Sequence, residues 1–158
     1  MLVTSPKTTI PSFYLIFFQW IDPVICIWSA SMDFLTPATV LSSHVPNPHV
    51  DIGHTMIMQQ RGGAMLNFAV ISAALLRYTY DPQIWRIVQS AFFIVDLSLY
   101  YAAYQVLGAQ GRLDPTKWRW EDWGSVVISA VAGAARVAFL MGVGLEKGMK
   151  TRNGKKAQ

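Results

Sequence analysis

Residues 84–107 read IWRIVQSAFFIVDLSLYYAAYQVL, an apolar stretch that contains only two charged residues. A helix needs roughly 20 residues, at about 1.5 Å each, to cross the ~30 Å hydrocarbon layer of a bilayer, so this stretch is long enough to span it. Working outward, three more segments have this length and character, at about 11–32, 56–77 and 123–145, and proline-rich or polar loops separate them. The sequence therefore predicts an all-α integral membrane bundle of about four transmembrane helices, forming one domain over residues 1–145.

The composition agrees with lipid as the solvent. Hydrophobic types make up 53% of the 158 residues, and 14% are charged, where a soluble domain carries about a quarter. So few charged residues cannot cover the surface of a small water-soluble domain. The single cysteine, Cys26, also excludes an intramolecular disulfide.

The distribution of lysine and arginine predicts the orientation. With four spans, eight of the thirteen basic residues fall on the side that holds both termini, five of them in the tail 146–158. The positive-inside rule therefore places both termini in the cytosol. No basic stripe crosses a helical face, which argues against a nucleic-acid partner. The tail ends in Lys155 and Lys156, three and two residues before the last, and resembles a di-lysine retrieval signal, so we expect the endoplasmic reticulum.

Each predicted span carries one polar residue near its middle: Asp22, Asn67, Asp96 and Arg136 in chain order. A charge exposed to lipid at that depth costs about 3 kcal/mol, so we expect these side chains to point inward and to meet. Two interpretations stay open. The residues hold the helices together, or they are catalytic, with the aspartates as acids or bases and the other two positioning them.

A second set of residues predicts a binding cleft on the lumenal side of this layer. Arg61 and Gln60 lie toward that end of their span, and His54 lies just outside it. Tyr100 and Tyr104 follow Asp96 at helical spacing and so share its face. These five residues are candidates for substrate binding in a cleft whose floor is formed by the mid-membrane charges.

We expect neither a metal nor another cofactor. The three histidines, His44, His49 and His54, are five residues apart in a proline-rich loop, a spacing that fits no established zinc signature. His54 is the one nearest the predicted cleft. The tryptophans around the start of the last span are typical of an interfacial belt; alternatively, Glu121 or Asp122 overhangs the cleft as a second acid.

Several stretches together resemble a known family. IPSFYLIFFQWIDP opens the first span, VDLSLYY lies in the third, and WEDWGSVVIS leads into a fourth that ends ARVAFLMGVGL. This pattern resembles small fungal four-span integral membrane proteins, a domain family without an assigned activity. It is more remotely similar to sterol isomerases of the emopamil-binding type and to fungal membrane-bound terpene cyclases. That second resemblance implies Asp96 as the proton donor, with Tyr100 and Tyr104 along the path of the cation.

These observations lead to two functional hypotheses. The first is a membrane protein of the endoplasmic reticulum that acts on a lipophilic small molecule, as an acid–base cyclase or isomerase of fungal secondary metabolism. Its partners are then the bilayer, the substrate and other proteins of the pathway. The alternative is a non-catalytic membrane scaffold or lipid-binding accessory protein. A third hypothesis, a small transporter or proton-relay subunit, gives Asp96 the role of proton carrier.

Overall fold

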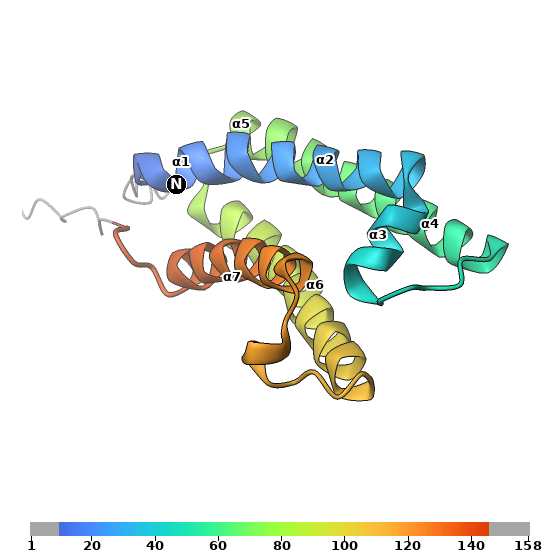
Figure 1. The fold of residues 1–158 in the computed structure, drawn as a ribbon. Coiled ribbons are helices and arrows are strands. Elements are labelled where there is room, and N and C mark those ends of the chain that lie inside the picture. The colour runs from blue at the N-terminus through green and yellow to red at the C-terminus, as the bar shows by residue number, and fades with distance from the viewer. Residues whose placement is uncertain (1–9, 146–158) are drawn as a thin grey trace, which may run out of the picture.

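The computed structural model describes residues 10–145, which fold into helices joined by short connections, with no strand in this range (Figure 1). The first long helix is continuous over Ser12–Leu35 and consists of α1 (Ser12–Ile16), a π-helical turn η1 (Phe17–Ile21) and α2 (Asp22–Leu35). A short helix α3 (Pro37–His44) follows it directly. Pro37 is the first residue of α3, a position where no backbone N–H donor is needed, and Pro11 is the residue immediately before α1.

The second long helix runs without a break through α4 (Ile52–Val70), a π-helical turn η2 (Ile71–Leu75) and α5 (Leu76–Tyr78). Helix α6 (Pro82–Ala109) is the longest, and Gly111 ends it with a φ of 65° that L side chains rarely adopt. After a 3₁₀ turn η3 (Pro115–Lys117), α7 (Trp120–Leu140) returns toward the end of the bundle where α1 begins.

Among residues 10–145, three helices are long and apolar enough to cross a membrane: Ser12–Leu35, Pro82–Ala109 and Trp120–Leu140. The segment predicted as the span 56–77 is helical, but it carries Gln59, Gln60 and Arg61 and is not among these three. The prediction of an all-helical membrane protein is therefore confirmed, whereas the count of four spans is not. The tail 146–158 lies outside the described residues.

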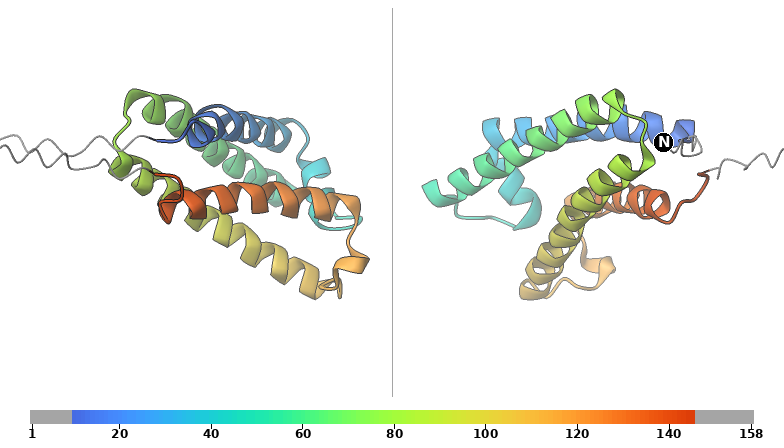
Figure 2. Two further views of the ribbon diagram at one scale, coloured as in Figure 1. Left: turned by 90° about the vertical axis from the view of Figure 1, so that its left-hand side faces the viewer. Right: turned by 180° about the vertical axis from the view of Figure 1, so that it is seen from behind.

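The long helices form two antiparallel hairpins (Figure 2). The first hairpin pairs α1–α2 with α4–α5, and the second pairs α6 with α7. Gly62 lets the first pair approach closely, because a Cβ atom there would lie 2.9 Å from the Phe34 ring and 3.1 Å from Asp33 Cβ. In the second hairpin α6 inclines away from α7 toward the connection that joins them (Figure 2).

A polar clasp joins the two helices of the first hairpin at their π-helical turns. Pro23 has no N–H, so it gives no hydrogen bond to the carbonyl of Gln19 four residues earlier. Instead, Arg77 Nη2 donates to that carbonyl at 2.7 Å, and Gln19 Nε2 donates to the Leu76 carbonyl at 2.7 Å. Arg77 also lies over the Trp20 ring, 3.9 Å from its centroid. The Gln19 carbonyl, which Pro23 leaves without its helical donor, is thus satisfied by a side chain of the partner helix.

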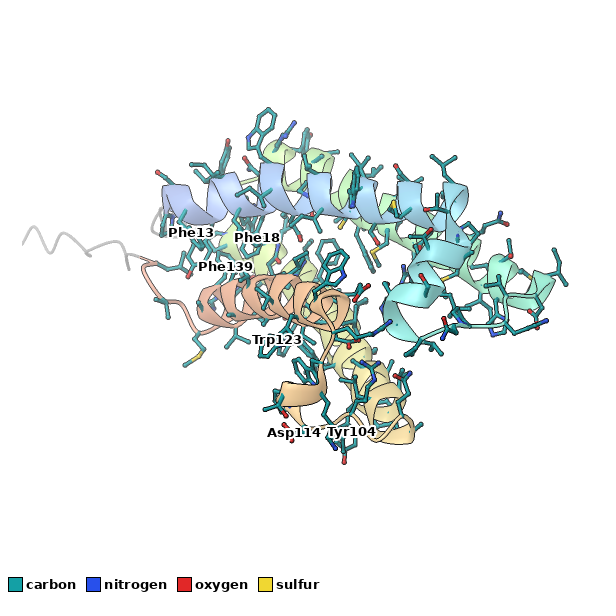
Figure 3. All side chains as sticks on the ribbon, viewed as in Figure 1. Phe13, Phe18, Tyr104, Asp114, Trp123 and Phe139 are labelled. Carbon is teal, nitrogen blue, oxygen red and sulfur yellow. The ribbon has the colours of Figure 1, made fainter. Side chains whose placement is uncertain are left out.

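The buried core lies at the end of the bundle where both described ends of the chain meet. Phe18, Trp85 and Phe139 are fully buried there and contact one another edge-on or tilted, with ring centroids 5.8–6.3 Å apart. Figure 3 shows Phe18 and Phe139 together between the first and last helices, while Tyr104 and Trp123 lie toward the opposite end. Aromatic packing therefore joins the two hairpins at this closed end and leaves the space between them to widen away from it.

Candidate functional site

Three charged residues from three helices meet between the hairpins. Arg136 of α7 donates from Nη2 to both carboxylate oxygens of Asp22 on α2, at 2.9 and 2.8 Å. Its Nη1 donates to Asp96 Oδ2 on α6 at 2.9 Å. The sequence-based expectation that these side chains would find one another agrees with this geometry. We call Asp22, Asp96 and Arg136 the charged triad.

The triad is largely buried, and with both carboxyls ionised it carries one unbalanced negative charge. The side chains of Asp22 and Arg136 are 3% and 5% exposed, and that of Asp96 is 16% exposed. Two carboxylates face one guanidinium, and no other cation bonds to either of them among residues 10–145. Because an uncompensated charge is costly in a low-dielectric site, a single proton shared by the two carboxyls makes the triad neutral.

The two aspartates differ in how much of each carboxyl is bonded. Both oxygens of Asp22 accept hydrogen bonds from Arg136. Asp96 uses only Oδ2, and its Oδ1 has no partner in the described part of the chain. Asp96 is therefore the member of the triad with an oxygen that can hold a transferable proton.

The triad borders a cavity of about 240 Å³ between the hairpins, which we call the inner compartment. Its walls are mostly apolar side chains, including Ile25, Cys26, Met65, Leu99 and Ile128. Phe68 and Phe92 also line it and contact each other, with ring centroids 4.7 Å apart. The compartment therefore combines an apolar body, aromatic faces and a small polar group.

A second cavity of about 340 Å³, the outer compartment, continues away from the closed end. Both compartments share six lining residues: His44, Arg61, Met65, Val95, Leu99 and Ser125. They are thus two parts of one cleft, and the larger part is within the size range of small-molecule sites. The outer wall is made largely of α6 residues between Val95 and Leu107 and of the first turns of α7.

The polar residues around the outer compartment are neutralised by partners. Arg61 donates from Nε to Asp33 Oδ2 at 2.9 Å and from Nη2 to Asp33 Oδ1, and Asp33 is fully buried. Asp122 accepts hydrogen bonds from Arg112 and Arg119. The prediction left open that Asp122 overhangs the cleft as an acid; it does line the outer compartment, but two guanidinium groups hold it.

Helix α3 is held across the outer end of the cleft by the second hairpin. Arg119 donates from Nη1 to the Ser42 carbonyl and from Nη2 to the Ser43 carbonyl, both at 3.0 Å. Gln110 Nε2 donates to the His44 carbonyl at 3.3 Å. These bonds place the last turn of α3, and with it the His44 ring, at the junction of the two compartments.

Several predicted site residues lie outside the cleft, among them Asn67 of the catalytic set. Asn67 and Gln60 are exposed on α4, and Tyr104 is 60% exposed on α6 where this helix has inclined away from α7. Tyr100 is half-buried, with its hydroxyl 3.1 Å from where a Cβ on Gly133 would lie, so it packs against α7. Of the proposed binding set, the structure brings Arg61 alone to the cleft.

His54 is replaced by His44 as the histidine of the cleft. His54 is exposed at the start of α4, where its backbone N–H donates to Asp51 Oδ1 at 2.8 Å and its ring Nδ1 lies 2.8 Å from the same oxygen. The backbone hydrogen bond, together with the adjacent imidazole, lowers the pKa of the Asp51 carboxyl. His54 is therefore the partner of a helix N-cap, away from the triad.

Sequence analysis missed four residues that contribute to the site. Asp33 was missed because it lies one residue beyond the predicted end of the first span. The signal that could have found it is Arg61, a positive charge within a predicted span that needs a carboxylate partner. Phe68 and Phe92 were not singled out, because nothing in the sequence distinguishes them from the other apolar residues of their helices. His44 gave no local signal at all, because its position depends on Arg119, whose partners are 76 and 77 residues away in the chain.

The fold and the cleft define the protein as an all-helical integral membrane protein with charged residues buried between two hairpins. The chain belongs to the family described as a domain of unknown function, DUF7704, whose model matches residues 7–146. This agrees with the predicted membership of a domain family without an assigned activity. Neither a curated protein nor a solved structure is significantly similar to the chain, so the resemblance to isomerases and cyclases gains no support from relatives.

Proposed function

We propose that this protein binds a lipophilic small molecule in the cleft and isomerises or cyclises it by acid–base chemistry at Asp96. The observation that carries the proposal is the continuity of the cleft with the charged triad: an apolar cavity ends at the Asp96 carboxyl, one oxygen of which has no hydrogen-bond partner among residues 10–145. A largely apolar pocket with a few polar groups is the usual form of a small-molecule site.

The chemistry follows from the charge of the triad. A protonated Asp96 next to the Asp22–Arg136 ion pair is neutral overall, so the acid is available without an unpaired charge. Its proton passes to one carbon of a double bond, breaking the O–H bond as a C–H bond forms, and the neighbouring carbon becomes cationic. The cation then loses a proton from an adjacent C–H bond to the Asp96 carboxylate, either directly or after attack by a second double bond of the same molecule. The product is an isomer or a ring, and the carboxyl is regenerated.

The surroundings support such a cation. Phe68 and Phe92 line the inner compartment beside Asp96, and the faces of aromatic rings attract positive charge. Phe68 and Phe92 thus take the role that the resemblance to isomerases and cyclases implied for Tyr100 and Tyr104. Asp22 and Arg136 are positioning residues in this scheme, because they hold Asp96 and balance its charge.

The location belongs to the same proposal. A fourth crossing by the helix of α4, η2 and α5 places both termini on one side, which the basic residues favour as cytosolic. The two lysines near the C-terminus support the endoplasmic reticulum, and they lie outside the described residues. The cleft then opens toward the lumenal half of the membrane, and a role in secondary metabolism remains part of the proposal.

A scaffold role is the competing explanation, and one observation favours it. Both terminal nitrogens of Arg136 are bonded to carboxylates, which is the arrangement expected of residues that join helices. The two explanations differ in whether the triad exchanges a proton with a bound alkene. They also differ in whether filling the cleft matters.

The test uses the purified full chain in lipid nanodiscs made up in D₂O, with farnesol and geranylgeraniol as unsaturated probes. Acid–base isomerisation places deuterium on carbon, which mass spectrometry of the recovered probes detects. We expect incorporation by the wild type, its loss in Asp96→Asn and its retention in Asp114→Asn, a change at an exposed loop residue. Absence of incorporation by the wild type, together with a destabilised Asp96→Asn, supports the scaffold.

A second pair of variants tests the cleft itself. Leu99 lines both compartments, whereas Leu97, two residues earlier on the same helix, is 50% exposed on the outside. Leu99→Trp fills the cleft and is expected to abolish probe binding, while Leu97→Trp leaves it unchanged. Equal binding by the two variants places the probe outside the cleft and contradicts the proposal.

A further inference from the structure

We infer that the ligand of the cleft is an amphipathic alcohol, whose hydroxyl group is held between His44 and Arg61 while its apolar body extends toward the charged triad. This inference rests on the proposed function, because it names the class of molecule that the same cleft takes. Both residues line both compartments, so they face the space where the compartments join.

The hydrogen bonds of His44 fix which ring nitrogen carries the proton. Nδ1 lies 2.9 Å from the Val40 carbonyl, which can only accept, so the hydrogen of a neutral imidazole is on Nδ1. The Ser43 hydroxyl donates to the same carbonyl and lies 2.9 Å from Nδ1. Nε2 therefore keeps its lone pair, and it has no partner among residues 10–145. At the junction of the compartments His44 is a hydrogen-bond acceptor.

Arg61 supplies the matching donor without a net charge. Its Nε and Nη2 are occupied by the two oxygens of Asp33, which leaves Nη1 without a partner in the described range. Asp33 is fully buried and neutralises the guanidinium. The side chain of Arg61 is 34% exposed, so Nη1 is accessible to a ligand in the cleft.

One acceptor, one donor and no uncompensated charge match a hydroxyl group better than other polar end groups. A hydroxyl donates its hydrogen to His44 Nε2 and accepts from Arg61 Nη1. A carboxylate or phosphate has only acceptor oxygens near neutral pH, so it places lone pairs against the lone pair of Nε2. Its negative charge also finds no unbalanced positive charge on Arg61, because Asp33 already neutralises the guanidinium. An ether accepts from Arg61 but has no hydrogen for His44.

The remainder of the ligand has to be apolar. Between the His44–Arg61 pair and the triad, the shared walls are Met65, Val95 and Leu99 with Ser125. An alcohol bound by its hydroxyl at the junction therefore directs an apolar chain or ring system into the inner compartment, where the proposed chemistry takes place at Asp96. The double bond that reacts lies away from the hydroxyl end.

The experiment compares farnesol, its methyl ether and its monophosphate as competitors of radiolabelled farnesol on the full chain in nanodiscs, with all three measured at one fixed pH. One net hydrogen bond corresponds to a factor of about three to ten in affinity. We expect the alcohol to bind more tightly than the ether by this factor, and more tightly than the phosphate. His44→Phe is expected to bring the alcohol-to-ether ratio close to one, whereas His49→Phe, at an exposed loop residue, preserves it.

The outcomes separate the two proposals. Equal affinity of the wild type for alcohol and ether, with binding still lost in Leu99→Trp, overturns the alcohol and leaves the cleft as a lipophile site. Preference for the phosphate also overturns it. If none of the three probes binds, both the alcohol and the proposed function fail. The wild-type ratio decides the matter even where His44→Phe does not fold.

Discussion

Replacing Arg136 by methionine removes the cation that bonds to both Asp22 and Asp96. The guanidinium makes three hydrogen bonds of 2.8–2.9 Å, two of them to a side chain that is 3% exposed. Methionine has a similar length and keeps the apolar contacts, so the change isolates the charge. Two carboxyls then remain between the hairpins without a counter-ion.

The expected cost is large. Removing one partner of a buried ion pair costs about 3–5 kcal/mol, because the other charge is left unpaired or must be neutralised. Removing the charges of the two carboxylates as well should restore stability, since replacing a whole group of buried ions by uncharged residues often leaves the free energy of unfolding unchanged. We therefore expect Arg136→Met to unfold most easily, Asp22→Asn/Arg136→Met less so, and the triple variant with Asp96→Asn to lie within about 1–2 kcal/mol of the wild type.

Equilibrium unfolding in mixed micelles of increasing dodecyl sulfate content, followed by tryptophan fluorescence, measures these differences. Arg86→Met is the matched control, because Arg86 is exposed and makes no ion pair among residues 10–145. We expect this control to stay within about 0.5 kcal/mol of the wild type. A cost below about 1 kcal/mol for Arg136→Met, or a triple variant no better than the single one, refutes the argument from unpaired charge.

Three further predictions concern packing and pH. Gly62→Val should cost about 1–3 kcal/mol by overpacking, because its Cβ would lie 2.9 Å from an α2 ring. Gly63→Val, with nothing within 4 Å of its Cβ, should leave the α2–α4 packing intact. The same unfolding assay compares the two variants. Phe139→Ala should cost about 3 kcal/mol, the low end of the usual range, because lipid is as apolar as the core and the cavity is the main loss; a cost below about 1 kcal/mol would show that the closed end collapses around the gap. The pKa of Asp51 is lowered by the His54 N–H, so its cap is complete above its unfolded value of about 4 and is lost as the pH falls through the folded value. Amide exchange at the start of α4, corrected for its intrinsic pH dependence, should therefore rise in acid, and the rise should be absent in Asp51→Asn.

How far the site was predictable follows from what a sequence encodes about a helix. Depth along the axis can be counted from the ends of an apolar run, and this places Asp22, Asp96 and Arg136 at one level. Exposing a charge to lipid at that level is costly, so the depth and the charge of these three residues together were sufficient to predict that they face inward. The same argument applied to the neutral Asn67 fails, because an amide is less costly to leave outside.

Direction around the helix axis was the quantity that the sequence did not determine. Phe68 takes the inward place on α4 by packing on Phe92, and its neighbour Asn67 is thereby turned outward. Tyr104 does share a helical face with Asp96, but α6 has inclined away from α7 at that point, and no helix among residues 10–145 covers the Tyr104 side chain, which is 60% exposed. Both outcomes depend on how the helices cross, which local periodicity does not specify.

The segment predicted as the span 56–77 shows the same limit, here in its composition. The helix of α4, η2 and α5 was found where the sequence predicted it, yet its polar residues keep it below the hydropathy of the other three. One of these residues, Arg61, bonds to Asp33 and lines the cleft. The residue that weakens the membrane signal is thus used between the hairpins, which hydropathy along a single segment cannot reveal.

The two ion pairs of Arg136 connect different parts of the bundle. Its bond to Asp96 lies within one hairpin, whereas its bond to Asp22 crosses to the other. Because aromatic rings pack the hairpins together at one end, a separation of the hairpins at the other end would lengthen the bond from Arg136 to Asp22 and would leave the bond to Asp96 intact. Opening the bundle would then separate opposite charges in a medium of low dielectric constant, which costs free energy. Protonation of Asp22 would remove one of these charges and so lower the free energy needed to separate the hairpins.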